Sequence, residues 1–202
     1  SPLTPHHYVM TTLVDFADPG LVVLPTHRLV GGLPTDKLRA LAKQLGEYFD
    51  VVAAAEETSP KALDAAVRQL DALPGPAYVL YGPKPSGLRV ISLKPHWHKA
   101  TVDDSHSEAW NRLDVAVLHA VLGRILGLGS EDLASERYFR YTREAAYAVR
   151  QVQTEEEQLA LLLRPTPPMA IRDIALAGDK MPQKSTYFYP KLATGLVVNP
   201  LS

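Results

Sequence analysis

The feature that most constrains the fold is the mixture of short apolar segments and helix-like segments, without a regular strand–helix–strand rhythm. The clearest core strands are rich in β-branched and apolar residues and span 50–55, 77–81, 88–93 and 159–163. Short links between neighbouring strands favour antiparallel pairing. The helical segments then need a sheet face to cover. The sequence therefore predicts an α+β fold, with a mixed or largely antiparallel sheet and helices packed on it.

Other elements are predicted from local signals. Residues 7–15 and 21–24 are expected to form an antiparallel strand pair, and residues 25–34 a loop. Shorter strands are expected at 138–141 and 196–198, a hairpin loop at 82–87, and a single capped turn at Ser130. Helices are expected where apolar residues recur at helical spacing behind a capping residue. The predicted capping residues are Thr35, Ser59, Asn111, Thr142 and Thr166.

Length favours one α+β domain over residues 1–202, because 202 residues can bury a core without cross-links. The polar, histidine-rich stretch around 94–110 is the candidate seam between subdomains. The chain begins Ser1-Pro2 without an initiator methionine. We therefore interpret it as a piece of a longer protein, and the family resemblance given below implies that it is the C-terminal fragment.

Composition excludes several classes of function. The chain has no cysteine, which excludes disulfides, thiolate metal sites and a cysteine nucleophile, and fits a cytoplasmic location. The apolar run 113–128 is interrupted by Asp114, His119 and Arg124, so it is too polar for a membrane span. With 21 Lys+Arg against 22 Asp+Glu, a nucleic-acid partner is disfavoured.

The segment 181–191 reads Met-Pro-Gln-Lys-Ser-Thr-Tyr-Phe-Tyr-Pro-Lys and is the main candidate for a ligand site. Ammonium and hydroxyl groups suit phosphate, and aromatic rings can stack on a base. In an extended strand Lys184 and Lys191 face opposite ways, so both reach one ligand only if the chain bends near Pro190. The alternative is an edge strand whose rings pack on a helix and whose lysines prevent aggregation. The candidate anion-binding residues are Lys184, Ser185, Thr186, Tyr187, Tyr189 and Lys191.

The second candidate group follows a predicted strand end. His27 and Arg28 could serve as an acid/base group and an anion clamp. The alternative is a turn in which both side chains bond nearby carbonyls. We predict that this pair and the 184–191 segment converge in the fold around a negatively charged ligand.

Three further groups are better explained by structure than by function. His-x-His spacing with nearby aspartates could bind a metal, but a solvated loop is the favoured interpretation, and no metal site is predicted. This group comprises His96, His98, Asp103, Asp104 and His106. Asp114 is interpreted as a capping residue and His119 as a core histidine. Arginines that alternate with aromatic residues can bind nucleic acid, but an ordinary half-buried strand shows the same pattern and is the favoured interpretation. These arginines are Arg137, Arg140 and Arg143.

Several segments, in the same order along the chain, resemble a bacterial and archaeal family known as domain of unknown function 1015. They are Asp18–Leu29, Leu113–Val115 with His119 and Leu126-Gly127, and Met181–Leu192 followed by Gly195-Leu196-Val197. Full-length members carry an upstream Ala-Asp-Gly-His-His-Arg segment, which resembles ParB-like proteins. That group includes nucleotide-using free serine kinases and DNA-binding partition proteins. His6-His7 lacks the context of that motif.

The resemblance implies a phosphate- or nucleotide-binding portion of a small-metabolite enzyme, with a kinase-like enzyme as the expected type, acting with the missing N-terminal half. The expected partner is a phosphorylated small molecule or nucleotide. Alternative functions are a nucleic-acid-associated module and a non-catalytic scaffold or dimerisation domain. A scaffold would expose an apolar patch and lack a pocket at the 184–191 segment. The sequence assigns no catalytic residue and no cofactor.

Overall fold

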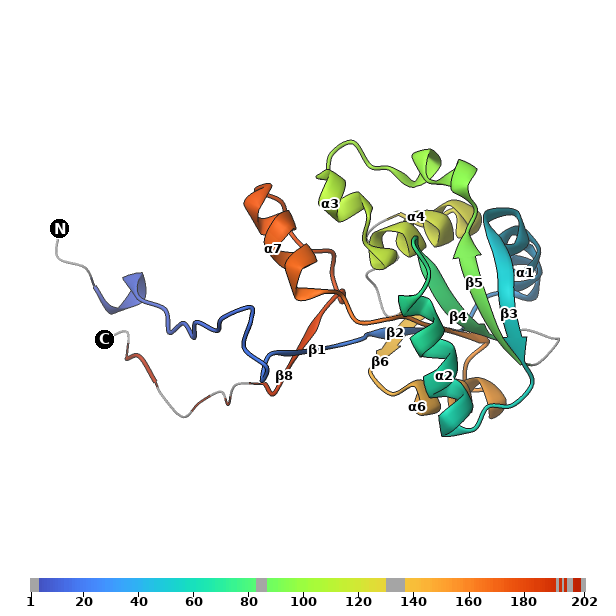
Figure 1. Ribbon diagram of the computed structural model, residues 1–202, viewed down its shortest axis with the longest axis horizontal. Helices are drawn as coiled ribbons and strands as arrows, with labels where there is room; N and C mark the ends of the chain where they lie inside the picture. Colours follow the sequence, from blue (N-terminus) through green and yellow to red (C-terminus); the bar gives the residue numbers. More distant parts are fainter. Residues whose placement is uncertain are drawn as a thin grey trace.

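The protein is described by a computed structural model over residues 4–82, 87–129, 137–191, 193, 195 and 198–200. Its body is a six-stranded sheet with the order β3-β5-β4-β7-β2-β6, in which all neighbours are antiparallel. A separate two-stranded sheet pairs β1 with β8. Helices pack on the larger sheet, which confirms the predicted α+β class (Figure 1).

The strands are β1 Val22–Leu24, β2 His27–Val30, β3 Phe49–Ala55, β4 Ala77–Tyr81, β5 Leu88–Leu93, β6 Phe139–Thr142, β7 Leu159–Leu162 and β8 Tyr187–Tyr189. The helices are α1 Thr35–Tyr48, α2 Pro60–Asp71, α3 Glu108–Asn111, α4 Asp114–Leu126, α6 Ala145–Gln153 and α7 Pro168–Leu176. Short 3-10 turns occur at Pro5–His7, Pro95–Trp97 and Lys99–Thr101.

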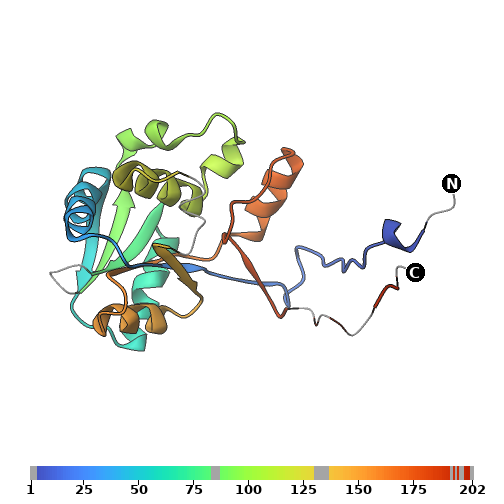
Figure 2. The ribbon, with the colours of Figure 1, turned by 180° about the vertical axis from the view of Figure 1, so that it is seen from behind.

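Two helical layers enclose the sheet (Figure 2). Helices α1 and α4 bury their apolar stripes on one face, together with Val30 and Leu161. Helices α2 and α6 cover the other face, together with Leu29 and Leu162. Successive side chains of a strand point to opposite faces, so adjacent residues of β2 and β7 enter different cores. All of β7 is buried because it is covered on both sides.

The predicted capping residues are only partly correct. The Ser59 hydroxyl accepts a hydrogen bond from the third residue of α2, as predicted. Asn111 does not cap the long helix, because its amide donates to carbonyls within the loop 103–107. It ends the short helix α3, and α4 begins at Asp114. Thr142 likewise stands three residues before α6, where its hydroxyl accepts from the Glu144 amide.

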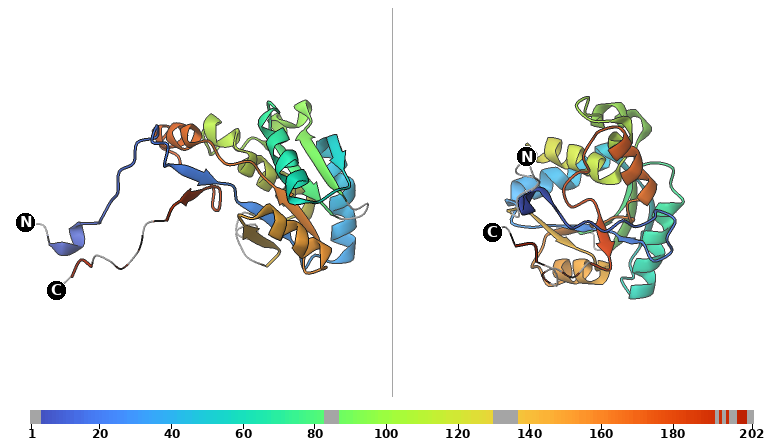
Figure 3. Two further views of the ribbon diagram at one scale, coloured as in Figure 1. Left: turned by 60° about the horizontal axis from the view of Figure 1, so that its bottom comes forward. Right: turned by 90° about the vertical axis from the view of Figure 1, so that its left-hand side faces the viewer.

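Two predictions near the N-terminus are wrong. Residues 8–15 form no strand, and Leu13 is 94% exposed. The reason is that β1 pairs with β8, more than 160 residues away, so residues 8–15 have no neighbour to complete a ladder. The expected loop at 25–34 contains β2, which lies between β7 and β6. Figure 3 shows residues 4–21 extending away from the body.

The histidine-rich stretch contains two 3-10 turns and leads into α3. A subdomain seam near 94–110 stays a prediction. Residues 83–86 of the hairpin loop predicted at 82–87, the turn at Ser130 and residues 196 and 197 of the last predicted strand lie outside the described residues. Among the helices that are described, none has the length and apolar character needed to cross a membrane.

Candidate functional site

Arg28 brings the two predicted segments into contact. It is 1% exposed, and its Nη2 donates a hydrogen bond of 3.0 Å to the Lys184 carbonyl. Its Nη1 donates to the Thr26 carbonyl, whereas its Nε has no hydrogen-bond partner among the described residues. Burial lowers the pKa of Arg28 to about 10, so the guanidinium stays charged at neutral pH. The structure thus places a buried cation at the junction of these segments.

Two tyrosine rings each contact two cationic side chains at this junction. The Tyr141 ring centroid lies 5.5 Å from the Arg28 guanidinium carbon and 5.7 Å from the Lys184 Nζ. The Tyr187 centroid lies 4.2 Å from the Arg143 guanidinium carbon and 4.4 Å from the Lys191 Nζ. Such distances allow cation–π attraction. Tyr141 of the first trio lines a large cavity, and Arg143 of the second lines a smaller pocket that also contains His27. We call the two trios together the cation–tyrosine cluster: Arg28, Tyr141, Arg143, Lys184, Tyr187 and Lys191.

The cluster contains four positively charged side chains. Within the described parts of the chain, none of its four cations forms an ion pair with a carboxylate. Lys184, Arg143 and Lys191 are exposed, so their charges are accessible from solvent. The cluster is therefore chemically suited to an anion.

The other predicted residues of the 184–191 segment have different surroundings. Ser185 is buried, and its hydroxyl donates to the Pro182 carbonyl at 2.7 Å. Its own carbonyl accepts a 2.8 Å hydrogen bond from the Thr166 hydroxyl. Thr186 is half-buried, and Tyr189 is 53% exposed in β8, opposite β1. Ser185 thus anchors the segment, because its hydroxyl already bonds the protein.

His27 points away from Arg28 and Tyr141, although it lines a small pocket together with Arg143. Its neighbour Leu29, two residues along β2, belongs to the core under α2 and α6, so His27 points to that side. Its Nδ1 accepts a 3.1 Å hydrogen bond from the Leu163 amide. Burial, with a smaller effect of Arg28, lowers the pKa of His27 to about 4. The imidazole is therefore neutral and internally bonded at physiological pH.

A cavity of about 1210 Å³ lies beside the cluster and shares Tyr141 with it. Helix α4, the loop 100–106 and the turn 180–183 form its walls. His119 lines it, and burial lowers the pKa of His119 to about 3, with Arg28 adding to the effect. Further chemically active side chains in the wall are His106, Trp110, Arg124 and Lys180.

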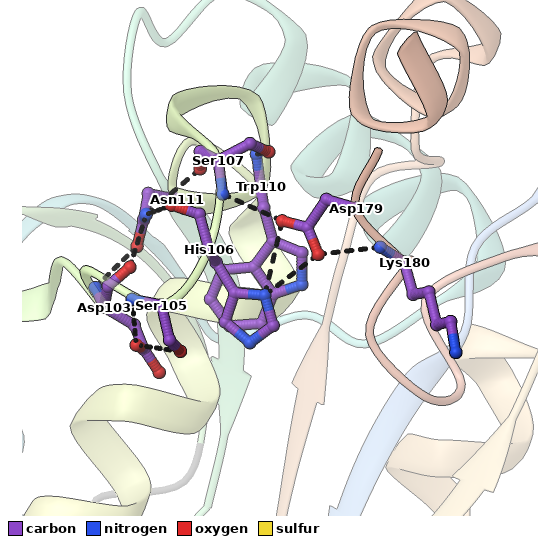
Figure 4. Close-up of polar contacts among 8 residues, drawn as sticks. All are labelled: Asp103, Ser105, His106, Ser107, Trp110, Asn111, Asp179 and Lys180. Carbon is purple, nitrogen blue, oxygen red and sulfur yellow. Dashed lines mark hydrogen bonds and ion pairs between the residues drawn. The ribbon is translucent and has the colours of Figure 1, made fainter. Parts of the chain in front are cut away.

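His106 is paired with a carboxylate at this wall (Figure 4). Its Nδ1 lies 3.0 Å from the Asp179 Oδ1. Asp179 also accepts from the backbone amides of Ser107, at 2.8 Å, and Lys180, at 2.7 Å. The Ser107 amide is the largest cause of a lowered Asp179 pKa, so the carboxylate is ionised. The His106 ring stacks on Trp110 with 3.9 Å between centroids and 6° between planes.

The end of α7 places Asp179 in this position. Gly178 has a φ of +73°, and the Asp179 amide donates to the Ile174 carbonyl at 3.1 Å, which closes the helix with a left-handed turn. Ile174 packs on Leu113 and Ala116, which fixes α7 against α3 and the start of α4. The sequence pointed to His106 only as a metal ligand and missed this pair, because its members are 73 residues apart. The glycine stop after α7 was the only local signal.

The remaining predicted groups have structural partners. Asp103 accepts hydrogen bonds from the amide and the hydroxyl of Ser105. The described residues contain no group of three or more His, Asp or Glu side chains that could hold a metal ion. Asp114 pairs with Arg164, with 2.8 Å between Oδ2 and Nε, rather than capping a helix from the N3 position. Arg164 also donates to carbonyls at the end of α2. Arg140 forms an ion pair with Glu157.

The sequence matches the family described as "Protein of unknown function (DUF1015)" over residues 1–116. This range is more than half of the 202 residues, and the chain belongs to that family. The match includes Asp18–Leu29, one of the segments that carried the resemblance, whereas Met181–Leu192 lies outside it. No curated protein matches the sequence.

Among solved structures, a free serine kinase mutant in complex with AMP has a TM-score of 0.46 at 12% identity, over 88% of this chain and 57% of that one. A conserved hypothetical protein from Pyrococcus furiosus has a TM-score of 0.46 at 14% identity, over 88% of this chain and 60% of that one. A free serine kinase in complex with AMP has a TM-score of 0.43 at 14% identity, over 88% of this chain and 57% of that one. This chain thus spans less than two thirds of each.

Proposed function

We propose that this chain is the phosphate- or nucleotide-binding portion of a cytoplasmic, kinase-like small-metabolite enzyme that acts together with an upstream portion of the same protein. The observation that carries the proposal is the cation–tyrosine cluster beside the cavity. Arg28 and Lys184 pack on the Tyr141 ring at the cavity, and Arg143 and Lys191 pack on the Tyr187 ring of the second trio. None of these four cations has a carboxylate partner among the described residues. A bound phosphoryl group would supply the missing negative charge.

Arg28 explains why an anion would be stabilising at this position. A charge removed from water is costly unless it is paired. Among the described residues, Arg28 forms hydrogen bonds only to neutral carbonyls. Its Nε also lacks a partner among the described residues. Because it holds the Lys184 carbonyl, it positions the lysine and adds to the positive potential around it. In the proposed site Arg28 is therefore a positioning residue, and Lys184 contacts the phosphoryl oxygens.

The cavity provides room for the rest of a nucleotide. Small-molecule sites commonly have volumes of about 300–1,000 Å³. The volume of about 1210 Å³ therefore exceeds what a nucleotide requires. Tyr141 belongs to both the cluster and the cavity wall, so a ligand can place phosphate at the cluster and its base or sugar in the cavity. Aromatic faces such as that of Tyr141 stack favourably on bases.

The arrangement suits phosphoryl transfer because that reaction depends mainly on positioning and charge stabilisation. Lys184 and Lys191 would neutralise charge on the phosphoryl oxygens, and Tyr141 and Tyr187 hold the cations in place. The acceptor of the phosphoryl group would be a small hydroxyl-bearing metabolite.

Isothermal titration calorimetry with ATP, ADP, AMP and inorganic phosphate tests the proposal. We expect ATP to bind, and Lys184→Ala to weaken its binding about tenfold, as expected for loss of a charged hydrogen bond of about 1.4 kcal/mol. The matched control is Lys43→Ala, an exposed lysine on α1. It should leave the affinity unchanged. An absence of binding by all four compounds, or an equal effect of both substitutions, would overturn the proposal.

A second candidate function, docking of another protein part, is favoured by the extended N-terminal segment. Exposed apolar side chains gather there, and such surfaces mark association sites. They are Tyr8, Val9, Met10, Leu13, Val14 and Phe16. We propose the upstream portion of the same protein as the partner. A separately expressed upstream portion should copurify with this chain and with its Thr12→Ser variant, but not with its Leu13→Asp variant. Copurification with the Leu13→Asp variant would contradict the docking proposal.

A further inference from the structure

We propose that His106 is the proton-accepting residue of the cavity, held in position by Asp179, and that it takes the proton from the hydroxyl group of the small metabolite that accepts the phosphoryl group. The geometry of the pair is independent of the cation–tyrosine cluster. The identity of the ligand rests on the proposed function. His106 would be the catalytic residue and Asp179 a positioning residue.

The carboxylate is fixed behind the imidazole. Asp179 receives hydrogen bonds from two backbone amides, of Ser107 and Lys180, in addition to the His106 ring. Backbone donors cannot rotate away, so the carboxylate keeps one orientation. His106 lines the cavity and Asp179 does not. A base at the cavity wall with its orienting carboxylate behind it is the arrangement that general-base histidines require.

The second ring nitrogen is the one left for the ligand. When Nδ1 donates to Asp179, the neutral ring carries its proton there, and Nε2 has a lone pair. Among the described residues Nε2 makes no hydrogen bond, and Figure 4 shows it directed away from Asp179. Stacking on Trp110 at 3.9 Å prevents the ring from tilting. The hydrogen bond to Asp179 and the stacking on Trp110 thus fix the His106 ring, and Nε2 remains available to accept a proton.

A purely structural role does not account for this arrangement. Asp179 holds the start of α3 through the Ser107 amide, and that contact does not require an imidazole. The other histidines of the same loop, His96 and His98, are exposed and form no ion pair within the described chain. Only His106 of these three combines a carboxylate partner with a place in the cavity wall.

In the proposed reaction a ligand hydroxyl oxygen forms a bond to the γ-phosphorus of a nucleoside triphosphate, and the bond from that phosphorus to the leaving diphosphate oxygen breaks. The hydroxyl proton moves to His106 Nε2. The resulting imidazolium is stabilised by the ionised Asp179. The cation–tyrosine cluster balances the charge of the phosphates.

The first test determines which nitrogen carries the proton. Long-range ¹H–¹⁵N NMR of the full ¹⁵N-labelled chain at pH 7.5 should show His106 in the Nδ1–H form, with the signal assigned by its loss in His106→Gln. Asp179→Ala should shift the ring toward the Nε2–H form. Asp173→Ala, an exposed aspartate on α7, is the matched control and should change nothing. An Nε2–H form in the unmodified protein would overturn the inference.

The second test needs no substitution, so it holds even if Asp179→Ala fails to fold. Diethyl pyrocarbonate modifies unprotonated histidine nitrogens, and mass spectrometry reports each site. In the proposed site the base or sugar of ATP occupies the cavity that His106 lines, so ATP should cover the imidazole. ATP at about ten times its Kd should therefore slow modification of His106 about tenfold. His96 and His98 are the internal controls and should react at unchanged rates.

The outcomes separate the two proposals. ATP binding in calorimetry without protection of His106 overturns this inference and leaves the proposed function standing. An Nδ1–H tautomer that depends on Asp179, in a protein that binds no ATP, supports the positioned base and overturns the proposed function. Protection of His106 together with that tautomer supports both.

Discussion

Arg28 and Lys184 are 156 residues apart in sequence and are joined by a 3.0 Å hydrogen bond from the Arg28 Nη2 to the Lys184 carbonyl. This bond ties the six-stranded sheet, through β2, to the segment that leads into β8 (Figure 1). A buried guanidinium therefore fixes the backbone of an exposed lysine. Stability and the proposed anion binding consequently depend on the same residue.

Arg28→Ala should destabilise the protein by about 2–4 kcal/mol, because it leaves a cavity and two carbonyl groups without their donor. Urea unfolding at pH 7 measures this free energy. ATP at about 100 times its Kd should stabilise the unmodified protein by about 2.7 kcal/mol, and Arg28→Ala by clearly less. Equal stabilisation of both proteins would contradict a role of Arg28 in the anion site.

Tyr187→Leu should weaken ATP binding several-fold, whereas Tyr187→Phe should not. The ring of Tyr187 holds Arg143 and Lys191, and each cation–π contact at an exposed site contributes about 0.5–1 kcal/mol. Phenylalanine keeps the ring face and leucine does not. Calorimetric titration of both variants checks this prediction, and equal affinities would show that the ring does not organise the cations.

Acidification should destabilise the protein through His27. Its folded pKa of about 4 lies below the usual 6.5, so between these values the unfolded chain binds a proton that the folded protein does not. Stability then rises with pH across this window, and on the order of 3 kcal/mol is lost between pH 6.5 and 4. His27→Asn keeps an acceptor for the Leu163 amide. This substitution should reduce the pH dependence of the free energy of unfolding measured in urea. His119 contributes in the same direction, so part of the dependence should remain. An unchanged pH dependence would exclude His27 as a source of it.

Arg164→Ala should cost about 3–5 kcal/mol, because it leaves a largely buried Asp114 carboxylate without its partner. It also removes hydrogen bonds to carbonyls at the end of α2. Arg172→Ala breaks an exposed pair with Asp173, and its cost should stay below about 1 kcal/mol. Thermal unfolding of both variants checks the contrast, and similar costs would mean that the Arg164 network is loosely held.

Local signals predicted most elements of the body. The apolar runs at β3, β4, β5 and β7 and the Ser59-Pro60 start of α2 were located correctly, because each depends on residues close in sequence. The strand predicted from the residue pattern at 8–15 does not form, because a segment with high β-propensity becomes a strand only when another strand lies beside it. The strand β2 was missed because its flanking proline and glycines are typical of loops.

The candidate site shows the same division. Residue types alone pointed to Lys184, Lys191 and Arg28, since cations and rings suit phosphate. They did not reveal that each lysine contacts a different tyrosine, or that His27 points to the opposite face. The His106–Asp179 pair had no local pattern beyond the glycine that ends α7.

The sequence by itself determined the α+β class, most helices and strands, and which side chains could bind an anion, because these follow from periodicity and chemistry over a few residues. Only the tertiary structure decided that β8 pairs with β1, that Arg28 meets Lys184, and that Asp179 lies behind His106. Those contacts join residues 73 to 167 positions apart. No short-range pattern encodes them, because they depend on how both core faces pack.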